Sequence, residues 1–254
     1  MNSIENSFER FDDRVENYVK YRPGYPEAVF DLLEKEFNLS VGNTVADLGT
    51  GTGISAKPFL ERGFKVYGIE PNEAMRSAAT RYLHGFEDFY AVEGTSQETG
   101  LATDSVELVT AFQAFHWFND ERAVREIKRI VKDGGGFALV WNERQLDSNA
   151  FLREYEAFLE RFGNDYALVR HDNLDTAQFE NSFGTPIKHT SFPNSQICDF
   201  EQLKGRMCSS SYMPNSDSAN FEMLINALGE LFAKHQTNNR VELIYDTNIY
   251  YGIL

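Results

Sequence analysis

Glycines and acidic residues lie close together near residue 50, in a pattern that could hold a ligand against the backbone. The segment VADLGTGTG, Val45–Gly53, carries Asp47 in a short apolar run and then three glycines at every second position. A second apolar run ends in Glu70, about twenty residues after the first glycine. Glycine allows positive φ and close approach of a ligand, and a helix that starts after such a turn has unpaired N–H groups. The spacing therefore indicates a small-ligand site at a strand-to-helix turn.

A dinucleotide is one candidate ligand, but the glycine spacing disfavours it. The dinucleotide fingerprint places glycines at the first, third and sixth positions of the turn. Gly49 and Gly51 fit, whereas the sixth position is Ile54 and the third glycine, Gly53, comes one residue early. Asp47 would repel a pyrophosphate but would suit a cationic ligand. The sequence therefore disfavours an NAD-dependent oxidoreductase.

The elements that must position these residues alternate between strand and helix. Unbroken apolar runs indicate buried strands, and apolar residues three or four apart indicate helices. We expect strands at 45–48, 65–69, 89–92, 106–112 and 137–141, and helices at 26–37, 54–62, after Asn72, and at 119–131. Pro58 lies far into its helix and should displace or bend the helix start. This alternation predicts an α/β fold with a doubly wound parallel sheet.

The pattern changes after residue 142. Amphipathic helices are expected at 151–162 and 221–232, with irregular segments before them, and late strands at 187–192 and 244–251. We expect the stretch 134–136, three glycines, to stop the preceding helix. The chain is therefore predicted to be a single domain, 1–254. Its core would comprise about 25–142, 187–192 and 244–254, interrupted by insertions at about 143–186 and 193–240.

The motif D-x-G-x-G-x-G, with an acid closing the next strand, resembles the class I S-adenosylmethionine-dependent methyltransferases, and in particular the methyltransferase type 11 group. Gly94-Thr95-Ser96 stands where that family usually has Gly-Asp-Ala, whose Asp hydrogen-bonds the adenine amine. The segments YVKYRPGYP, FQAFHWFN and SSSYMP, at 18–26, 112–119 and 209–214, are similar to the trans-aconitate methyltransferase-like subgroup.

The resemblance implies a Rossmann-like, seven-stranded sheet of order 3-2-1-4-5-7-6 with strand 7 antiparallel, and a helical lid made by the two insertions. It implies that Glu70 accepts the ribose hydroxyls of the cofactor. The cofactor-binding residues would be Asp47, Gly49, Thr50, Gly51, Gly53, Glu70, Pro71, Asn72, Met75, Gly94, Thr95, Ser96 and Gln113. Those facing the substrate or forming the lid would be Tyr18, Tyr21, Arg22, Trp117, Ser211 and Tyr212.

His116 is the candidate general base, because a histidine can take up a proton near neutral pH. The same histidine could instead contact substrate or cofactor, or be structural. Aromatic residues after a strand, such as His116 and Trp117, are often packing residues. Methyl transfer is an in-line displacement that mainly needs alignment and exclusion of water. A carboxylate acceptor would need no base, whereas a phenol or a carbon acid could need one.

The composition narrows the class of partner. The net charge is −15, from 24 basic and 39 acidic residues, which disfavours nucleic acids and anionic membrane surfaces. No apolar run approaches the roughly 20 residues of a membrane span. The two cysteines, Cys198 and Cys208, predict neither a disulfide framework nor a metal site. We therefore expect a cytoplasmic enzyme without a metal.

The function predicted from the sequence is methyl transfer from S-adenosylmethionine to a small molecule. A small organic acid is the leading acceptor, on resemblance to the subgroup. A non-catalytic or regulatory protein that binds the cofactor is the alternative from another class, and Thr95 in place of the usual acid favours it. The strand-four segment lacks the N/D-P-P-Y/F motif of enzymes that methylate the amino groups of bases.

Overall fold

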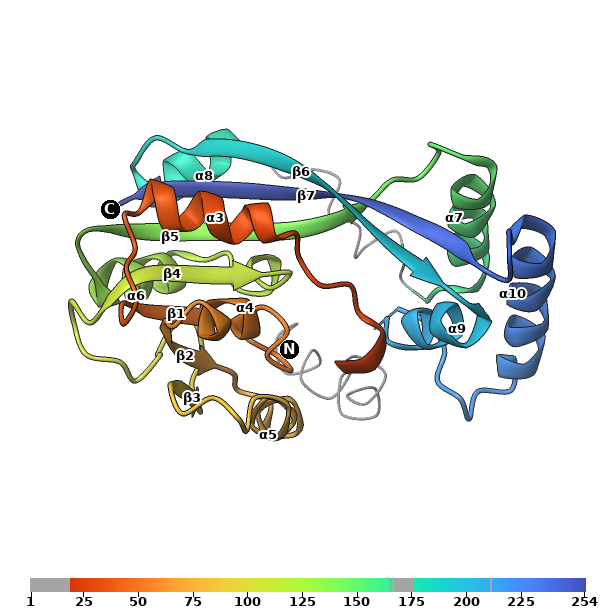
Figure 1. Ribbon diagram of the computed structural model, residues 1–254, viewed down its shortest axis with the longest axis horizontal. Helices are drawn as coiled ribbons and strands as arrows, with labels where there is room; N and C mark the ends of the chain where they lie inside the picture. The colour runs from red at the N-terminus through yellow and green to blue at the C-terminus, as the bar shows by residue number, and fades with distance from the viewer. Residues whose placement is uncertain (1–18, 165, 167–175, 211) are drawn as a thin grey trace.

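A single seven-stranded mixed sheet organises the chain (Figure 1). The computed structural model describes residues 19–164, 166, 176–210 and 212–254. The strand order is β3-β2-β1-β4-β5-β7-β6, and β7 runs antiparallel to both of its neighbours. The predicted order and the antiparallel β7 are both confirmed. The strands are β1 Thr44–Leu48, β2 Lys65–Ile69, β3 Phe89–Val92, β4 Val106–Phe112, β5 Val131–Arg144, β6 Lys188–Cys198 and β7 Val241–Ile253.

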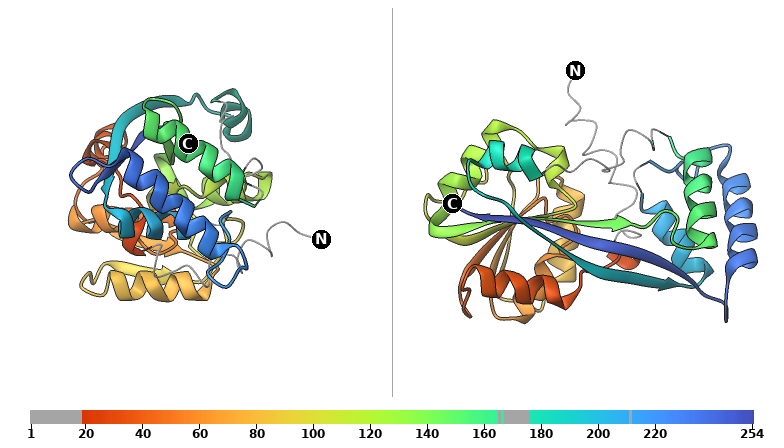
Figure 2. Two further views of the ribbon diagram at one scale, coloured as in Figure 1. Left: turned by 90° about the vertical axis from the view of Figure 1, so that its right-hand side faces the viewer. Right: turned by 90° about the horizontal axis from the view of Figure 1, so that it is seen from above.

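Helices cover both faces of this sheet, so it is doubly wound (Figure 2). On one face, α3 Glu27–Glu36 and α4 Ala56–Glu61 pack through a cluster that includes Phe30 and Phe59. On the other face, α6 Glu121–Ile130 and α8 Thr176–Phe183 pack through a second cluster. A further helix, α5 Glu73–Tyr82, lies beside β3. Both clusters use the apolar faces that helical spacing predicted for α3 and α6.

Two boundaries show how local chemistry sets the elements. The helix expected from residue 54 begins at Ala56, which places Pro58 in the first turn, where a missing N–H breaks no helical hydrogen bond. The expectation that strand five starts at residue 137 was wrong, because β5 begins at Val131, directly after α6. Val131 pairs with Val106 and Gly136 pairs with Leu108, so the register shifts between these two pairs and the extra residues of β5, which include Gly134 and Gly135, lie there.

The last three strands are longer than predicted, and their extensions carry a second group of helices. In Figures 1 and 2, β5, β6 and β7 run on from the α/β layers to α7 Ala150–Phe162, α9 Phe200–Cys208 and α10 Phe221–His235. We call these three helices the helical cap. They enclose a third apolar cluster that includes Leu203, Leu228 and Tyr245. The helices α8 and α9 arise in segments expected to be irregular. For α9, a capping box of Asp199 and Gln202 starts the helix.

Within the described residues, no helix is long and apolar enough to cross a membrane.

The close approach of two strands gives a test of this architecture. Gly136 on β5 faces the Gly252 carbonyl on β7, and a Cβ there would overlap that oxygen and the Phe37 ring. We expect Gly136→Ala to lower the free energy of unfolding by about 3 kcal/mol, because backbone and core must both shift. Urea unfolding measures this change.

Gly85→Ala is the matched control, since a Cβ at Gly85 would meet no atom within 4 Å. It should change the free energy of unfolding by less than about 0.5 kcal/mol. Equal effects of the two substitutions would contradict the β5–β7 register.

Candidate functional site

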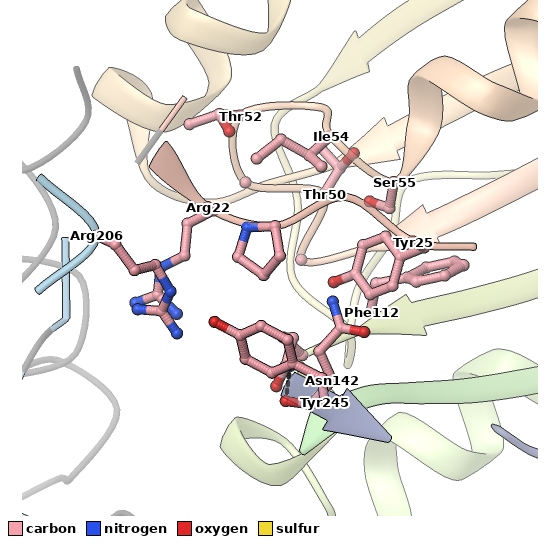
Figure 3. Close-up of a pocket in the computed structure, with 14 residues that line it drawn as sticks. Arg22, Tyr25, Thr50, Thr52, Ile54, Ser55, Phe112, Asn142, Arg206 and Tyr245 are labelled. Carbon is pink, nitrogen blue, oxygen red and sulfur yellow. Dashed lines mark hydrogen bonds between the residues drawn. The ribbon is translucent and has the colours of Figure 1, made fainter. Parts of the chain in front are cut away.

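A small cavity of about 40 Å³ lies between the sheet and the helical cap (Figure 3). The β1–α4 loop and the end of β4 form one side, which is the switch point where open α/β sheets bind ligands. The end of β5, α9, β7 and the segment before α3 complete it. The lining residues are Arg22, Pro23, Tyr25, Gly49, Thr50, Gly51, Thr52, Ile54, Ser55, Phe112, Gln113, Asn142, Arg206 and Tyr245.

Asp47 lies behind this loop rather than in the cavity. Its side chain is fully buried and accepts hydrogen bonds from three hydroxyls, those of Thr50 at 2.7 Å, Ser55 at 2.6 Å and Thr110 at 2.8 Å. Burial raises the pKa of the Asp47 carboxyl, and the three hydroxyls oppose that shift. The three donors belong to the loop, the residue before α4, and β4. Asp47 therefore holds the loop against the sheet and shows no exposed surface to a ligand.

The three glycines of the loop all have positive φ, at 68°, 57° and 85° for Gly49, Gly51 and Gly53. Their surroundings differ. A Cβ at Gly49 would come within 2.8 Å of Ala114, and one at Gly53 within 2.7 Å of Leu83. A Cβ at Gly51 would meet no atom closer than 3.9 Å. Gly49 and Gly53 are thus required by packing within the protein, whereas Gly51 leaves open space beside the cavity.

Glu70 connects the end of β2 to the same loop. Its carboxylate accepts the N–H of Gly51 at 2.9 Å and the N–H of Asn72 at 3.0 Å. Burial raises the pKa of the Glu70 carboxyl above its ordinary value of 4.5, and the two N–H groups and nearby Arg76 oppose the shift. A carboxylate offers about four lone-pair positions, so two remain for a ligand's hydroxyls.

The residues that follow Glu70 form the start of α5. The side chain of Asn72 caps this helix by accepting the N–H of Met75 at 2.8 Å. Arg76 donates to the carbonyl oxygens of Glu70 and Pro71, which fixes the turn. Met75 is buried against Ala78. These residues lie outside the cavity lining and position Glu70.

The turn after β3 uses its own polar groups. The Thr95 hydroxyl accepts the N–H of Glu98 at 3.2 Å, and the backbones of Thr95 and Glu98 pair with each other. The Ser96 hydroxyl donates to the side-chain oxygen of Gln97 at 3.0 Å. A Cβ at Gly94 would lie only 3.1 Å from the Glu98 carbonyl oxygen, so the turn leaves little space there. The hydroxyl that stands in place of the family's acid therefore already accepts one hydrogen bond within the turn.

Gln113 ends β4 at the cavity with a φ of 54°, a conformation that costs energy for a residue with a side chain. Its side-chain amide donates to the Asn142 carbonyl at 2.9 Å, and its N–H donates to the Val140 carbonyl at 2.8 Å. Both bonds are to β5. They hold the end of β4 in this turn beside the glycine loop.

His116 and Trp117 lie on a short 3₁₀ helix, η1 Phe115–Trp117, and neither lines the cavity. The Trp141 indole N–H faces His116 Nδ1 at 3.4 Å. Because an indole N–H can only donate, Nδ1 is the acceptor in this contact.

Of the predicted lid residues that the structure describes, only Arg22 lines the cavity. It donates to the Ser209 carbonyl at 2.9 Å, which joins the N-terminal segment to the end of α9. Tyr21 packs against Gly205 outside the cavity, and Tyr212 stacks on Tyr166 with ring centroids 4.8 Å apart. Tyr18 and Ser211 lie outside the described residues.

The structure adds lining residues that sequence reasoning missed, notably Tyr25, Asn142, Arg206 and Tyr245. Tyr25 belongs to the YVKYRPGYP segment and could have been included on that ground. Asn142 lies just beyond the predicted end of strand five, and Tyr245 lies near the start of the predicted last strand. No local sequence signal places either residue at the cavity. Arg206 sits in a segment where no helix was expected. These residues reach the site only through the extended strands and α9.

Comparisons with known proteins agree with this architecture. Residues 46–139, from β1 into β5, match the family model described as a methyltransferase domain. An uncharacterized methyltransferase of Geobacillus sp. is 30% identical over 160 residues, which cover 59% of this chain and 74% of that protein. This chain belongs to the methyltransferase domain family. An uncharacterized methyltransferase of Mycobacterium tuberculosis is 32% identical over 154 residues, 61% of this chain and 60% of that relative.

The matched segment thus spans about 60% of the length of the first curated relatives. Among solved structures, phosphoethanolamine N-methyltransferase 2 of Haemonchus contortus, in complex with phosphomonomethylethanolamine and S-adenosylhomocysteine, superposes with a TM-score of 0.59. The identity is 14%, and the match covers 100% of this chain and 60% of that chain. At this identity the likeness shows the shared fold.

The hydroxyls around Asp47 give a test of how the loop is held. Thr110→Val removes one donor to a fully buried carboxylate while keeping the side-chain shape. We expect the free energy of unfolding to fall by about 2 kcal/mol, as for a lost hydrogen bond to a charged group. Thr80→Val removes an exposed hydroxyl bond on α5 and should cost less than about 0.5 kcal/mol. A Thr110→Val protein as stable as the parent in urea would refute this role of Asp47.

Proposed function

We propose that this chain transfers a methyl group from S-adenosylmethionine to a small-molecule acceptor. The observation that carries the proposal is the position of Glu70. Its carboxylate sits at the end of β2, tied to Gly51 of the glycine loop, with acceptor positions to spare. Membership of the methyltransferase domain family and the bound S-adenosylhomocysteine in the Haemonchus contortus structure support the same cofactor.

The residues present fit that cofactor. Glu70 would accept the two ribose hydroxyls, and the open side of Gly51 lets a ligand approach the loop backbone. The Thr95 turn would border the adenine. Pro71, Asn72 and Met75 would hold the start of α5 next to the ribose. When bound, the cofactor supplies a methyl group already activated by a cationic sulfur.

The chain's own contribution is then alignment and exclusion of water. The helical cap and the Arg22 segment close the cavity from the side opposite the loop. Gln113 and Asn142 fix the ends of β4 and β5 between the two sides. We propose a small organic acid as the acceptor. A carboxylate acceptor needs no general base, so this proposal does not require His116 in that role. We also propose a cytoplasmic location, on the basis of the low cysteine content.

Calorimetric titration with S-adenosylhomocysteine, and with NAD and NADP in parallel, tests the cofactor class. We expect binding of S-adenosylhomocysteine alone. Gly51→Ala should weaken that binding about tenfold or more, a loss of at least about 1.4 kcal/mol, because its methyl group would occupy the space left for the ligand. Binding of NAD without S-adenosylhomocysteine would overturn the proposal.

Gly42→Ala is the matched control for Gly51→Ala. Gly42 also has positive φ, at 86°, with no atom near its Cβ position, and it lies outside the cavity lining. Both substitutions should cost about 1 kcal/mol of stability through backbone strain. Gly42→Ala should leave cofactor affinity unchanged. A similar loss of affinity in both variants would mean that strain, and not occupancy of the site, caused the effect.

The raised pKa of Glu70 predicts a pH dependence of cofactor binding. Below that pKa the carboxyl is protonated and loses acceptor capacity for the ribose, so affinity should fall as pH is lowered from 8 towards 5. Glu70→Gln should weaken binding about tenfold at pH 8 and flatten this dependence. Glu73→Gln, an exposed change on the first turn of α5, should retain the parent's pH profile. An unchanged profile in Glu70→Gln would exclude Glu70 as the titrating group.

A further inference from the structure

We infer that Arg206 and Tyr245 form an anion-binding subsite that holds a carboxylate of the acceptor across the cavity from the glycine loop. The inference rests on the proposed function and names the residues that select the acceptor. Both residues belong to parts of the chain that the family match does not reach, Arg206 on α9 and Tyr245 on β7.

Arg206 is a partly buried cation without a carboxylate partner. Its guanidinium donates to the Ser210 hydroxyl at 3.0 Å, while its Nε is buried and forms no hydrogen bond. No carboxylate of the described residues lies within ion-pair distance of it. Arg62, Arg129 and Arg144 are also partly withdrawn from solvent, and each pairs with at least one glutamate. A buried charge is costly unless it is paired, so Arg206 is set up for an anion supplied from outside.

Tyr245 adds a second donor at the same place. Its side chain is 1% exposed, and its hydroxyl forms no hydrogen bond of good geometry although it lies beside Arg206. In Figure 3 the hydroxyl is directed toward the two arginines of the cavity. A buried hydroxyl without a partner costs free energy, and a phenol can donate to a carboxylate. Two buried donors thus converge on one point of the cavity.

The charge of the cavity supports an anionic ligand. The whole chain has a net charge of −15, yet the described residues that line the cavity include Arg22 and Arg206 and no aspartate or glutamate. Arg22 approaches from the N-terminal segment and Arg206 from the helical cap (Figure 3). Two like charges sharing one cavity favour a bound anion between them. Guanidinium groups bind carboxylates with strong, directional hydrogen bonds.

A carboxylate at this point could come from the acceptor or from the amino-acid end of the cofactor. We assign it to the acceptor, because Arg206 and Tyr245 belong to the cap side of the cavity. The cofactor contacts proposed above lie on the opposite side, at the glycine loop and Glu70. Substitution of Arg206 or Tyr245 should lower the affinity for the cofactor only if the carboxylate is the cofactor's own. Cofactor affinity therefore distinguishes the two possibilities.

The test uses the full chain saturated with S-adenosylhomocysteine and titrated with acetate, succinate and citrate, with succinamide as the uncharged probe. We expect at least one of the three anions to bind with a dissociation constant below about 20 mM, and succinamide not to bind. Arg206→Gln should weaken anion binding about tenfold or more, and Tyr245→Phe about threefold. Both variants should keep their affinity for S-adenosylhomocysteine within about twofold.

Lys204→Gln is the control, because it removes a positive charge from the same helix outside this cavity. It should bind the anions as the parent does. Arg206→Gln and Tyr245→Phe should also unfold at temperatures no lower than the parent, since each removes a buried polar atom that forms no hydrogen bond, Nε of Arg206 and the hydroxyl of Tyr245. A clearly lower unfolding temperature of Arg206→Gln would show that the guanidinium is structural and overturn the inference.

Other results would contradict the subsite, its assignment to the acceptor, or the proposed function. If none of the three anions binds, or if Arg206→Gln binds them as well as the parent, the subsite is wrong. If Arg206→Gln loses affinity for S-adenosylhomocysteine itself, the anion is the cofactor's own carboxylate and the assignment to the acceptor is wrong. Failure of the parent to bind S-adenosylhomocysteine would instead contradict the proposed function, so the two failures are distinguishable.

Discussion

The buried carboxylate of Asp47 is the constraint on which the site depends. Three hydroxyls from the loop, the residue before α4, and β4 converge on it, and Asp47 and Thr110 are also neighbours in the β1–β4 register. A carboxylate removed from water is tolerated only when its acceptor positions are filled. Asp47 therefore fixes the path of the loop, and the loop's path decides where Gly51 leaves space. Glu70, at the end of the next strand, also accepts a hydrogen bond from this loop, and some of its acceptor positions remain open.

The second constraint is the length of the last strands. β5 and β7 pair from Gly136 with Ile253 to Arg144 with Tyr245, well past the end of β4. Arg144 at the end of β5 forms a buried ion pair with Glu156 of α7, and Tyr166 donates to the same glutamate. The cap is thus joined to the sheet by backbone ladders and by a buried polar cluster. This connection brings α9 and Tyr245 opposite a loop that lies about 150 and about 190 residues earlier in the chain, respectively.

The two sides of the cavity differ in chemistry. The α/β side offers backbone N–H groups and glycines, and Glu70, an acid suited to hydroxyls, is tied to the glycine loop but lies outside the lining. The cap side and the N-terminal segment offer guanidiniums and a phenol. In an acidic chain, a cavity whose described lining residues include no aspartate or glutamate is a local reversal of charge. The general fold supports many chemistries, and the proposed acceptor subsite lies on this second side.

The sequence by itself determined the strands β1 to β4, the sheet order implied by the family resemblance, and the glycine loop with its acid. These features are local: unbroken apolar runs, a cap at Asn72 and a fixed spacing of glycines encode them within a few residues. Only the tertiary structure decided that Asp47 is buried behind the loop, that Trp141 contacts His116, and that Arg206 and Tyr245 face the cavity. Each of these depends on contacts between distant segments, and such contacts arise from strand pairing and packing that no local pattern encodes.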